Sequence, residues 1–463
     1  MEFLNRQDEL RRLDNALRHP GGLSVIWGRR RVGKSRLLLE WSRNRDGLYA
    51  VADQSAAPIQ RRYIAEAVRG RFPGFADVEY PDWRTFFERL ASESRAANWP
   101  GPFIIDELPY LIAADPSITA VLQNWLDSDQ RRPCLVVSGS SQRMMHGAIL
   151  EAGAPLYGRA SEAFALRPLR PGYLADAFSP CSPRELVSAY ALWGGMPRYW
   201  ELAEPFGADF GEAADALVLD PSGPLHEEPN RLLLAETPPV TGLRALLDVI
   251  GGGAHRLSEI AGRLNRPASS LSGPLATLVA MDLVRRETPF GSHPRSGKRS
   301  LYRMADPFMR QWFRVVAPHR ALLAVAPRET RIAHWARHRA ALEALAWEEL
   351  CRLCVPLLHR CDLPLAKLGP WQGAQRHWQG NNPEFDVVAR SVDGQRLLVG
   401  EAKWPANPFT ASHAPPHPGV QALPGATKAE IVHARFTPQA DVPIDQATGI
   451  HIVDAKNVMA ALR

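Results

Sequence analysis

The segment that most constrains the fold is Gly28–Ser35, which has the sequence GRRRVGKS and fits the pattern G-x-x-x-x-G-K-[ST]. An apolar run, Leu23–Trp27, comes directly before it, and a helical pattern over Arg36–Ser42 follows it. A strand, a glycine-rich turn and a helix in this order open a parallel α/β sheet. The N-terminal region is therefore expected to be a doubly wound α/β domain, with further buried strands at 103–105 and 134–138.

The same eight residues suit one kind of ligand, a nucleoside triphosphate. Gly28 and Gly33 allow the backbone to wrap a phosphate group, and N–H groups at the start of the following helix face the anion. Lys34 is predicted to reach the β- and γ-phosphates, and the Ser35 hydroxyl to ligate Mg²⁺. Because the chain has six lysines in 463 residues, a lysine at this position is a poor candidate for chance. The predicted cofactors are ATP and Mg²⁺.

Two acids end the second buried strand. The apolar run Phe103–Ile105 is followed by Asp106 and Glu107. Carboxylates at the end of a buried strand are costly unless a cation or a chemical task offsets their burial. Asp106 is therefore predicted to complete the Mg²⁺ shell, and Glu107 to orient or deprotonate the attacking water. Solvated acids at a strand end are the simpler interpretation in isolation, but behind a phosphate loop ATP hydrolysis is favoured.

The length of 463 residues predicts three or four domains. Apolar residues make up 45% and charged residues 22%, which excludes a disordered or fibrous chain. We expect a multidomain α/β protein. Its predicted parts are a P-loop ATPase core at 1–160, a helical lid at 161–235, a winged helix at 236–315, a helical linker at 316–345 and a mixed α/β domain at 346–463.

Charge and composition bear on partners and location. The net charge of +6 permits contact with nucleic acid without demanding it. No apolar run reaches the roughly 18 residues that a membrane helix needs, and the N-terminus lacks the basic-then-apolar pattern of a signal peptide. Five cysteines, an odd number in a long chain, do not make a disulfide framework. We therefore expect a cytoplasmic protein with reduced thiols and no membrane partner.

The region after residue 240 has the pattern of a winged helix. Helical patterns lie at 242–250, 255–261 and 267–281, and strand patterns at 283–287 and 300–303. Ser258 is predicted to cap the second helix. The basic segment 291–299 is the expected wing and can touch phosphates. The long helix carries almost no basic residue, whereas a groove-reading helix usually does, so DNA contact and protein packing both stay open.

Two acids and a lysine flank a predicted hairpin near the C-terminus. Strand patterns in this region lie at 385–391, 396–403 and 429–434, with one preceding helix at 342–358. The first two strands are joined by Asp393-Gly394, the strongest two-residue hairpin signal. With these residues at the turn, Asp386 faces Glu401, and Lys403 lies on the same face.

This arrangement suits metal-dependent cleavage of a phosphodiester. Like charges that face each other destabilise a hairpin, and a divalent cation between them would reverse that cost. Asp386 and Glu401 are predicted to hold Mg²⁺ against the scissile phosphate, while Lys403 positions or activates the water. A surface hairpin with Glu401 and Lys403 solvated is the simpler alternative.

The N-terminal motifs resemble the archaeal-type ATPase family of AAA- and STAND-like P-loop proteins. Besides the phosphate loop and Asp106-Glu107, the segments that carry the resemblance are Phe3-x-x-Arg6-x-x-Glu9-Leu10, Val137–Ser141, Pro155–Arg159 and Gly194–Tyr199 (GGMPRY). The resemblance implies ATP or GTP binding, with Arg6 near the base and Ser140 at the sensor position after the third strand. It makes Arg159 an arginine that reaches the γ-phosphate or a neighbouring subunit. A homo-oligomer therefore stays open, and so does an ordinary surface arginine.

The C-terminal pattern Asp386…Glu401-Ala402-Lys403 resembles the PD-(D/E)XK nuclease superfamily, with Phe385 in place of the proline before the first acid. The segment Trp347–Cys351 resembles the helix that often supplies a further acid, here Glu348. The resemblance implies a restriction-endonuclease-like fold in which Glu348 joins the two strand acids and the lysine in catalysis. A degenerate domain that binds without cutting stays open.

A zinc site is an alternative for the cysteines of this region. Cys351, Cys354, His359 and Cys361 have some of the required spacing. Cys351 and Cys354, however, fall in an apolar helical pattern, so buried core cysteines are favoured.

The sequence thus predicts an ATP-driven switch coupled to a metal-dependent nuclease-like domain that acts on nucleic acid, with DNA favoured over RNA. One alternative is a signalling or scaffold ATPase whose C-terminal domain binds without cleaving. Another is a nucleic-acid remodeler, in which ATP hydrolysis does work and no bond is cut. Intact Glu401 and Lys403 favour the nuclease, and the neutral surface of the winged helix favours the scaffold.

Overall fold

The chain forms two compact units. The computed structural model describes residues 1–19, 21–43, 45–128, 132–140, 142–145, 147, 149, 151–236, 241–293, 299–378, 384–405, 419–440, 442–445 and 448–463. One unit is Asn5–Pro168 with a short return segment that begins at Leu234. The other holds Met1–Leu4 and most of the chain after Leu169. The four segments that the sequence distinguishes after residue 160 therefore fall almost entirely within one unit.

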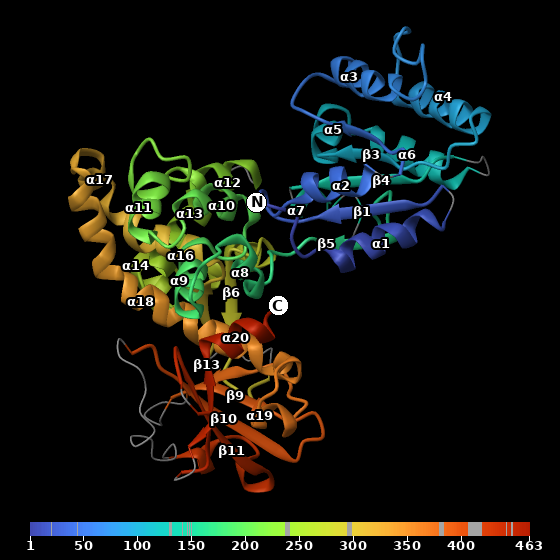
Figure 1. Cartoon of the computed structure of the whole chain (residues 1–463). Coiled ribbons are helices and arrows are strands. Elements are labelled where there is room, and N and C mark those ends of the chain that lie inside the picture. The colour runs from blue at the N-terminus through green and yellow to red at the C-terminus, as the bar shows by residue number, and fades with distance from the viewer. Residues whose placement is uncertain are drawn as a thin grey trace. The chain divides into compact units, whose positions relative to one another are not determined.

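The N-terminal unit is built on a parallel sheet. Its elements are α1 (Gln7–Leu17), β1 (Leu23–Trp27), α2 (Lys34–Ser42), β2 (Leu48–Val51), α3 (Ala57–Arg69), α4 (Trp83–Ala96), β3 (Phe103–Asp106), α5 (Leu108–Ala114), α6 (Ile118–Asp127), β4 (Leu135–Gly139), α7 (Gln142–Met145) and β5 (Ala160–Ala165). The strands run parallel in the order β2-β3-β4-β1-β5. Figure 1 shows α3 and α4 over one face of the sheet and α1 over the other. The predicted parallel α/β core is confirmed.

The central strands are apolar because helices cover both sheet faces. Val25, Ile105 and Val137, one from each of β1, β3 and β4, are buried in a single cluster with side chains of α3 to α6. Strands that run parallel bring their carboxyl ends to the same edge of a sheet. The phosphate loop after β1 and the acids at the end of β3 therefore lie at the same edge of the sheet, with β4 between the two strands.

The second unit begins with helices and a two-stranded hairpin. Its first elements are α8 (Leu174–Ala177), α9 (Pro183–Trp193), α10 (Pro197–Ala203), α11 (Phe210–Ala214), α12 (Glu228–Glu236), α13 (Thr241–Gly251), α14 (Leu257–Leu264), α15 (Ser272–Ala280), β6 (Val284–Glu287), β7 (Leu301–Met304), α16 (Pro307–Gln311) and α17 (Arg320–Val325). β6 and β7 pair antiparallel, with Val284 opposite Met304. The helices and strands predicted between 242 and 303 are thus present, and 294–298 of the expected wing lie outside the described residues.

The predicted cap of α14 is wrong. Ser258 lies inside the helix, and Arg256 is the residue that precedes it. The carboxylate of Glu259 accepts hydrogen bonds from the backbone N–H groups of His255 and Arg256, each over 3.1 Å. Arg256 is also bridged to Leu301 of the hairpin. Because the bridge to the strand holds the backbone at Arg256, the helix begins directly after this residue. Ser258 then lies inside the helix and cannot be its N-cap.

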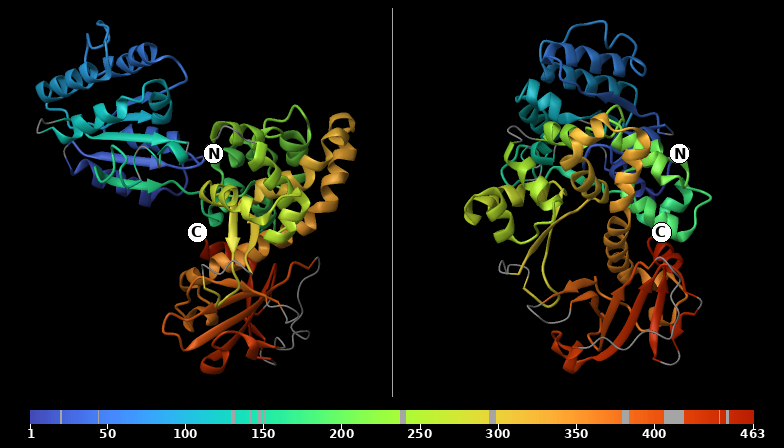
Figure 2. Two further views of the ribbon diagram at one scale, coloured as in Figure 1. Left: turned by 180° about the vertical axis from the view of Figure 1, so that it is seen from behind. Right: turned by 90° about the vertical axis from the view of Figure 1, so that its left-hand side faces the viewer.

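One long helix, α18 (Arg328–Cys354), contains the second half of the predicted helical linker and most of the helix predicted at 342–358. The helix expected from Leu342 begins instead at Arg328, after Pro327, and so runs across position 345, where the sequence placed a boundary. A proline directly before a helix favours its start there. In the right-hand view of Figure 2, α18 (orange) descends to the C-terminal sheet (red). Neither α18 nor any other helix of the described residues is long and apolar enough to cross a membrane.

The C-terminal part of the second unit is a mixed sheet. Its elements are α19 (Pro364–Lys367), β8 (Gln375–His377), β9 (Phe385–Arg390), β10 (Arg396–Ala402), β11 (Glu430–Thr437), β12 (Ile444–Asp445), β13 (Ile450–Asp454) and α20 (Ala455–Ala461). The strand order is β12-β13-β11-β10-β9-β8. β9 and β10 form the predicted hairpin in the predicted register, with Val387 opposite Gly400 and Arg390 opposite Leu397. The turn chemistry and the two-residue period were sufficient to set this register.

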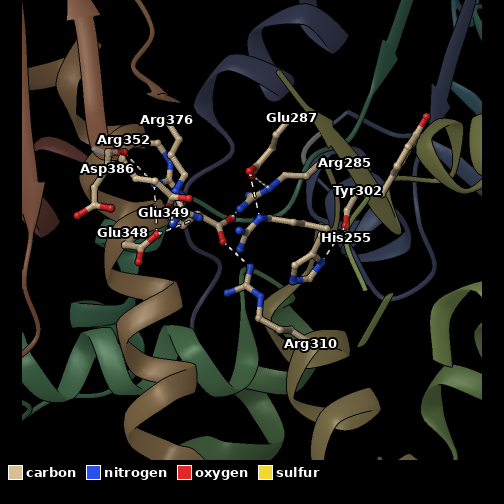
Figure 3. A network of polar contacts seen from close by, with 12 residues as sticks. His255, Arg285, Glu287, Tyr302, Arg310, Glu348, Glu349, Arg352, Arg376 and Asp386 are labelled. Atoms are coloured by element: carbon tan, nitrogen blue, oxygen red, sulfur yellow. Dashed lines mark hydrogen bonds and ion pairs between the residues drawn. The ribbon is translucent and has the colours of Figure 1, made fainter. Parts of the chain in front are cut away.

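A buried ion-pair network ties α18 to the hairpin and to α16 (Figure 3). Glu349 of α18 accepts from Arg285 of β6 over 2.7 Å and from Arg310 of α16 over 2.6 Å. Burial alone would raise the pKa of Glu349, but the two arginines outweigh burial and lower it to about 2. A carboxylate that is buried between two cations stabilises the fold only while all three are present.

We predict that Glu349→Gln destabilises the second unit by about 3–5 kcal/mol at neutral pH, because two buried arginines lose their shared anion. Glu349 has a folded-state pKa near 2, below its ordinary 4.5, so its stabilisation is complete above that ordinary value. It is lost as the pH falls towards 2. Urea unfolding followed by tryptophan fluorescence at several pH values measures both effects.

The matched control is Glu329→Gln, an exposed position in the first turn of the same helix. Equal urea concentrations at the midpoint of unfolding for the two variants would contradict the prediction. So would an acid-induced loss of stability in Glu349→Gln as large as that of the unaltered chain.

Candidate functional site

The phosphate loop joins β1 to α2 at the carboxyl edge of the parallel sheet. Gly28 (φ +154°) directly follows the strand, and Gly33 (φ +98°) directly precedes the helix. A Cβ atom at Gly28 would lie 2.6 Å from the backbone oxygen of Leu166. Both positions have backbone angles that residues with side chains rarely adopt. The backbone therefore needs the two glycines at the spacing of the pattern.

Two buried cations contact the loop. The Nζ atom of Lys34 donates to the carbonyl oxygen of Gly28 over 2.8 Å. Arg6 donates to the carbonyl oxygens of Val32 and Arg167, each over 2.9 Å. Arg6 thus ties the loop to the segment after β5. The placement of Arg6 near a nucleotide base, which the resemblance implies, stays a prediction.

Asp106 lies among hydroxyl groups at the end of β3. One oxygen of its buried carboxylate accepts from the hydroxyls of Ser35 (2.5 Å) and Tyr49 (2.7 Å). The Ser138 hydroxyl donates to the other oxygen. Burial and the neighbouring Asp106 raise the pKa of Tyr49, so the phenol remains a donor. Ser35 and Asp106 meet as the sequence predicted, and their hard oxygen atoms fit a Mg²⁺ ion.

Glu107 is turned towards the end of the neighbouring strand. Its backbone is left-handed (φ +60°), an uncommon conformation for a residue other than glycine. Its Oε2 atom accepts from the backbone N–H of Ser140 over 3.0 Å and from the Ser140 hydroxyl over 2.9 Å. Because β3 and β4 are neighbours in the sheet, these two predicted residues come together. The contact between them was not itself predicted.

The described contacts of Arg159 are not with the phosphate loop. Its guanidinium forms two hydrogen bonds of 2.7 Å with the carboxylate of Asp127, and it also donates to the carbonyl oxygen of Pro155. The pairing with Arg159 lowers the pKa of Asp127. These contacts are those of a surface ion pair. A role towards the γ-phosphate or a neighbouring subunit stays a prediction.

In the second unit, Glu348 of α18 and Asp386 of β9 are near enough for their charges to interact. Burial raises the pKa of both carboxyls, and the charge of Asp386 raises that of Glu348 further. Arg352 and Arg376 lie 3.6 and 4.0 Å from Oε2 of Glu348. Asp386 accepts from the backbone N–H of Ala402 over 3.1 Å. Figure 3 shows the acids and the two arginines gathered at one side of the network.

Glu401 of β10 lies between two cations. Its carboxylate is 2.7 Å from Nζ of Lys403 and 3.0 Å from the guanidinium of Arg435. Lys403 is 58% exposed. As the side chains of the described residues lie, no three of their His, Cys, Asp or Glu side chains are grouped to hold a metal ion. A cation shared by Asp386 and Glu401 therefore stays a prediction.

The cysteines of α18 are core residues, as predicted. Cys351 and Cys354 are fully buried. Burial raises the pKa of both thiols, as is expected of cysteines in an apolar core.

Sequence reasoning missed several residues that complete these sites, namely Tyr49, Ser138, Arg352, Arg376 and Arg435. Tyr49 lies in an ordinary apolar strand and carries no motif. The arginines are hard to single out among the 49 of this chain. One signal was available for Arg352, which follows Glu348 by four residues and so shares its helix face.

Comparison with known proteins identifies the N-terminal region. Residues 3–202 match a family model described as an ATPase domain predominantly from Archaea. Residues 312–413 match a second model, described as archaea bacterial proteins of unknown function. An uncharacterized protein of Methanocaldococcus jannaschii is 27% identical over 410 residues, which is 87% of each chain.

Two solved structures are similar to the chain. The Walker-type ATPase PABY2304 of Pyrococcus abyssi aligns with a TM-score of 0.53 at 21% identity, over 68% of this chain and 96% of that one. The ORC2 protein of Aeropyrum pernix aligns with a TM-score of 0.45 at 15% identity, over 73% and 95%. The first likeness supports a shared fold, and the second is too weak to carry an argument. Residues 3–202, which hold the phosphate loop, Ser35 and Asp106, thus resemble an ATPase domain that occurs predominantly in Archaea.

Proposed function

We propose that the chain hydrolyses ATP with Mg²⁺ at the phosphate loop and uses the state of the nucleotide to control a second unit that acts on nucleic acid. The observation that carries the first part is the pairing of Ser35 with Asp106 beside a buried Lys34. A hydroxyl and a carboxylate at this edge supply the oxygen ligands that Mg²⁺ prefers.

The roles of the residues follow from their positions. The ammonium group of Lys34, which donates to the Gly28 carbonyl, would donate to an oxygen of a bound γ-phosphate. Ser35 and Asp106 would hold Mg²⁺, whose charge would offset that of the phosphates. Glu107 takes the proton of the attacking water. In the conformation described, Ser140 holds the Glu107 carboxylate with two hydrogen bonds.

The contact between Glu107 and Ser140 gives the site two states. A γ-phosphate that recruits the Ser140 hydroxyl as a donor removes one bond from Glu107 and leaves its oxygen able to accept from water. Ser140 thus serves as the sensor, and Glu107 becomes competent when nucleotide is bound. Arg159 is assigned a role at a neighbouring subunit of a homo-oligomer, which its separate position next to Asp127 permits.

For the second unit we propose metal-dependent cleavage of a phosphodiester, with DNA favoured over RNA. The proximity of Glu348 and Asp386 supports it, because two buried acids that repel each other are stabilised by a cation. Glu401 and Lys403 would complete the site. The helices α13 to α15 with the β6–β7 hairpin are assigned as a winged helix, and 346–463 as a nuclease-like domain. The divisions at 160, 235 and 315 belong to the same proposal.

The alternative is a signalling or scaffold ATPase whose C-terminal domain binds without cleaving. One observation favours it. The carboxylate of Glu401 is already paired with Lys403 and Arg435, so a cation at this position has to displace them.

We predict that Glu107→Gln slows ATP hydrolysis by about 100-fold or more and leaves ATP affinity nearly unchanged, because an amide cannot accept the proton. Phosphate release measures the rate, and a fluorescent ATP analogue measures the affinity. Glu66→Gln, an exposed glutamate of α3, is the matched control. Equal hydrolysis by the two variants would remove Glu107 as the base.

We predict that the full chain nicks supercoiled plasmid with Mg²⁺ or Mn²⁺ and that Lys403→Ala abolishes the nicking, because the water loses its partner. Lys456→Ala, an exposed lysine of α20, should cut like the unaltered chain. An effect of ATP on the rate would show that the two units communicate. If the unaltered chain cuts neither plasmid nor RNA, the nuclease is excluded and the binding alternative remains.

A further inference from the structure

A cationic cavity lies between the β6 strand, helix α18 and strand β8. Its volume is about 340 Å³. Four arginines, Arg285, Arg286, Arg352 and Arg376, line it together with two glutamates, Glu287 and Glu349, so its lining has a formal charge of +2. This excess is unusual for a partly buried site, because buried charges are normally matched.

A second, smaller cavity adjoins the first across two shared side chains. It has a volume of about 40 Å³, and Arg285 and Arg352 line both cavities. Arg303, Arg310 and Arg314 also line it, against one acid, Glu348. The lining of both cavities is therefore short of negative charge.

Glu287 and Glu349 already form ion pairs with arginines that line the same two cavities. Glu349 pairs with Arg285 and Arg310, and Glu287 pairs with Arg285 over 2.7 Å and with Arg303 over 3.3 Å. Burial lowers the pKa of Arg303, and the charges of Arg376 and Arg285 lower it further although Glu287 opposes them.

Arg352 and Arg376 are the side chains best placed to take a further anion. Their distances to Glu348, 3.6 and 4.0 Å, exceed the roughly 2.7–2.9 Å of a charge-assisted hydrogen bond. Arg352 also donates to the backbone oxygen of Asp386, and Arg376 to the exposed carboxylate of Glu384, each over 3.0 Å. The Nε atom of Arg376 is buried and has no hydrogen-bond partner among the described residues. A planar guanidinium with a spare donor suits the two oxygens of a phosphate.

The larger cavity also has an apolar wall. Leu353, Pro356 and Trp378 lie among its lining residues. Leu353 is 45% exposed, so a large apolar side chain of the helix is open to solvent here. A ligand that fills this cavity has one anionic side and one apolar, ring-sized side.

We infer that these adjoining cavities bind a nucleoside phosphate, with the phosphate at Arg352 and Arg376 and the base against Leu353 and Trp378. The ligand is either a free mononucleotide or one nucleotide of a single strand, since both present the same groups. The site is separate from the phosphate loop, and it requires neither ATP hydrolysis nor cleavage of a phosphodiester.

The test uses the full chain with Lys34→Ala, so that the phosphate loop contributes no nucleotide binding. One probe is AMP, followed by calorimetry. The other is a fluorescent oligothymidylate of about 12 nucleotides, followed by anisotropy at two salt concentrations. The variants are Arg352→Gln with Arg376→Gln, and separately Arg286→Gln, an exposed residue whose loss leaves the buried network in place.

Removing both arginines should weaken the probe that binds by at least about tenfold, because each contributes a charge-assisted contact. Arg286→Gln should weaken it severalfold. Arg337→Gln, an exposed arginine on the same helix, is the matched control and should leave affinity unchanged. Binding of AMP alone identifies a free nucleotide as the ligand, and binding of the oligonucleotide alone identifies a strand. The inference is overturned if neither probe binds, or if both the double variant and Arg286→Gln bind like Arg337→Gln.

Discussion

The ATPase site depends on one carboxylate. Asp106 accepts from Ser35 of the loop helix, Tyr49 of β2 and Ser138 of β4, so a single buried anion links the ends of four elements. A buried carboxylate of this kind is stable because hydroxyl donors compensate its lost hydration. The same donors keep its oxygens directed towards the phosphate loop.

In the second unit, ion pairs instead of hydroxyl groups compensate a buried carboxylate. Glu349 is fully buried and is compensated by Arg285 and Arg310, from a strand and a helix far away in the sequence. Around it, arginines outnumber acids, whereas Glu348 and Asp386 nearby are acids held close to each other. Charge of both signs is thus concentrated next to α18.

The sequence correctly predicted features that depend on residues close together in the chain. The phosphate loop follows from eight consecutive residues, and the β9–β10 register follows from Asp393-Gly394 and a two-residue period. Ser258 misled because the start of α14 is set by a bridge between Arg256 and Leu301, a contact across the fold. Arg376 and Tyr49 could not be found for the same reason, since their partners are distant in the chain and neither belongs to a pattern. The two acids of α18 look alike in sequence, yet Glu349 is paired with two arginines of other elements and Glu348 lies beside Asp386.

The length of α18 has a mechanical consequence. A helix of 27 residues measures about 40 Å and bends little over that distance. Its side chains bond to α9 through Glu343 and to β9 through Arg352, so one straight helix connects the helices of the second unit to its sheet. A small tilt at the end near α9 moves the other end by a proportionate amount. A movement of the helices of the second unit therefore displaces Arg352 as well, because α18 has no hinge between them.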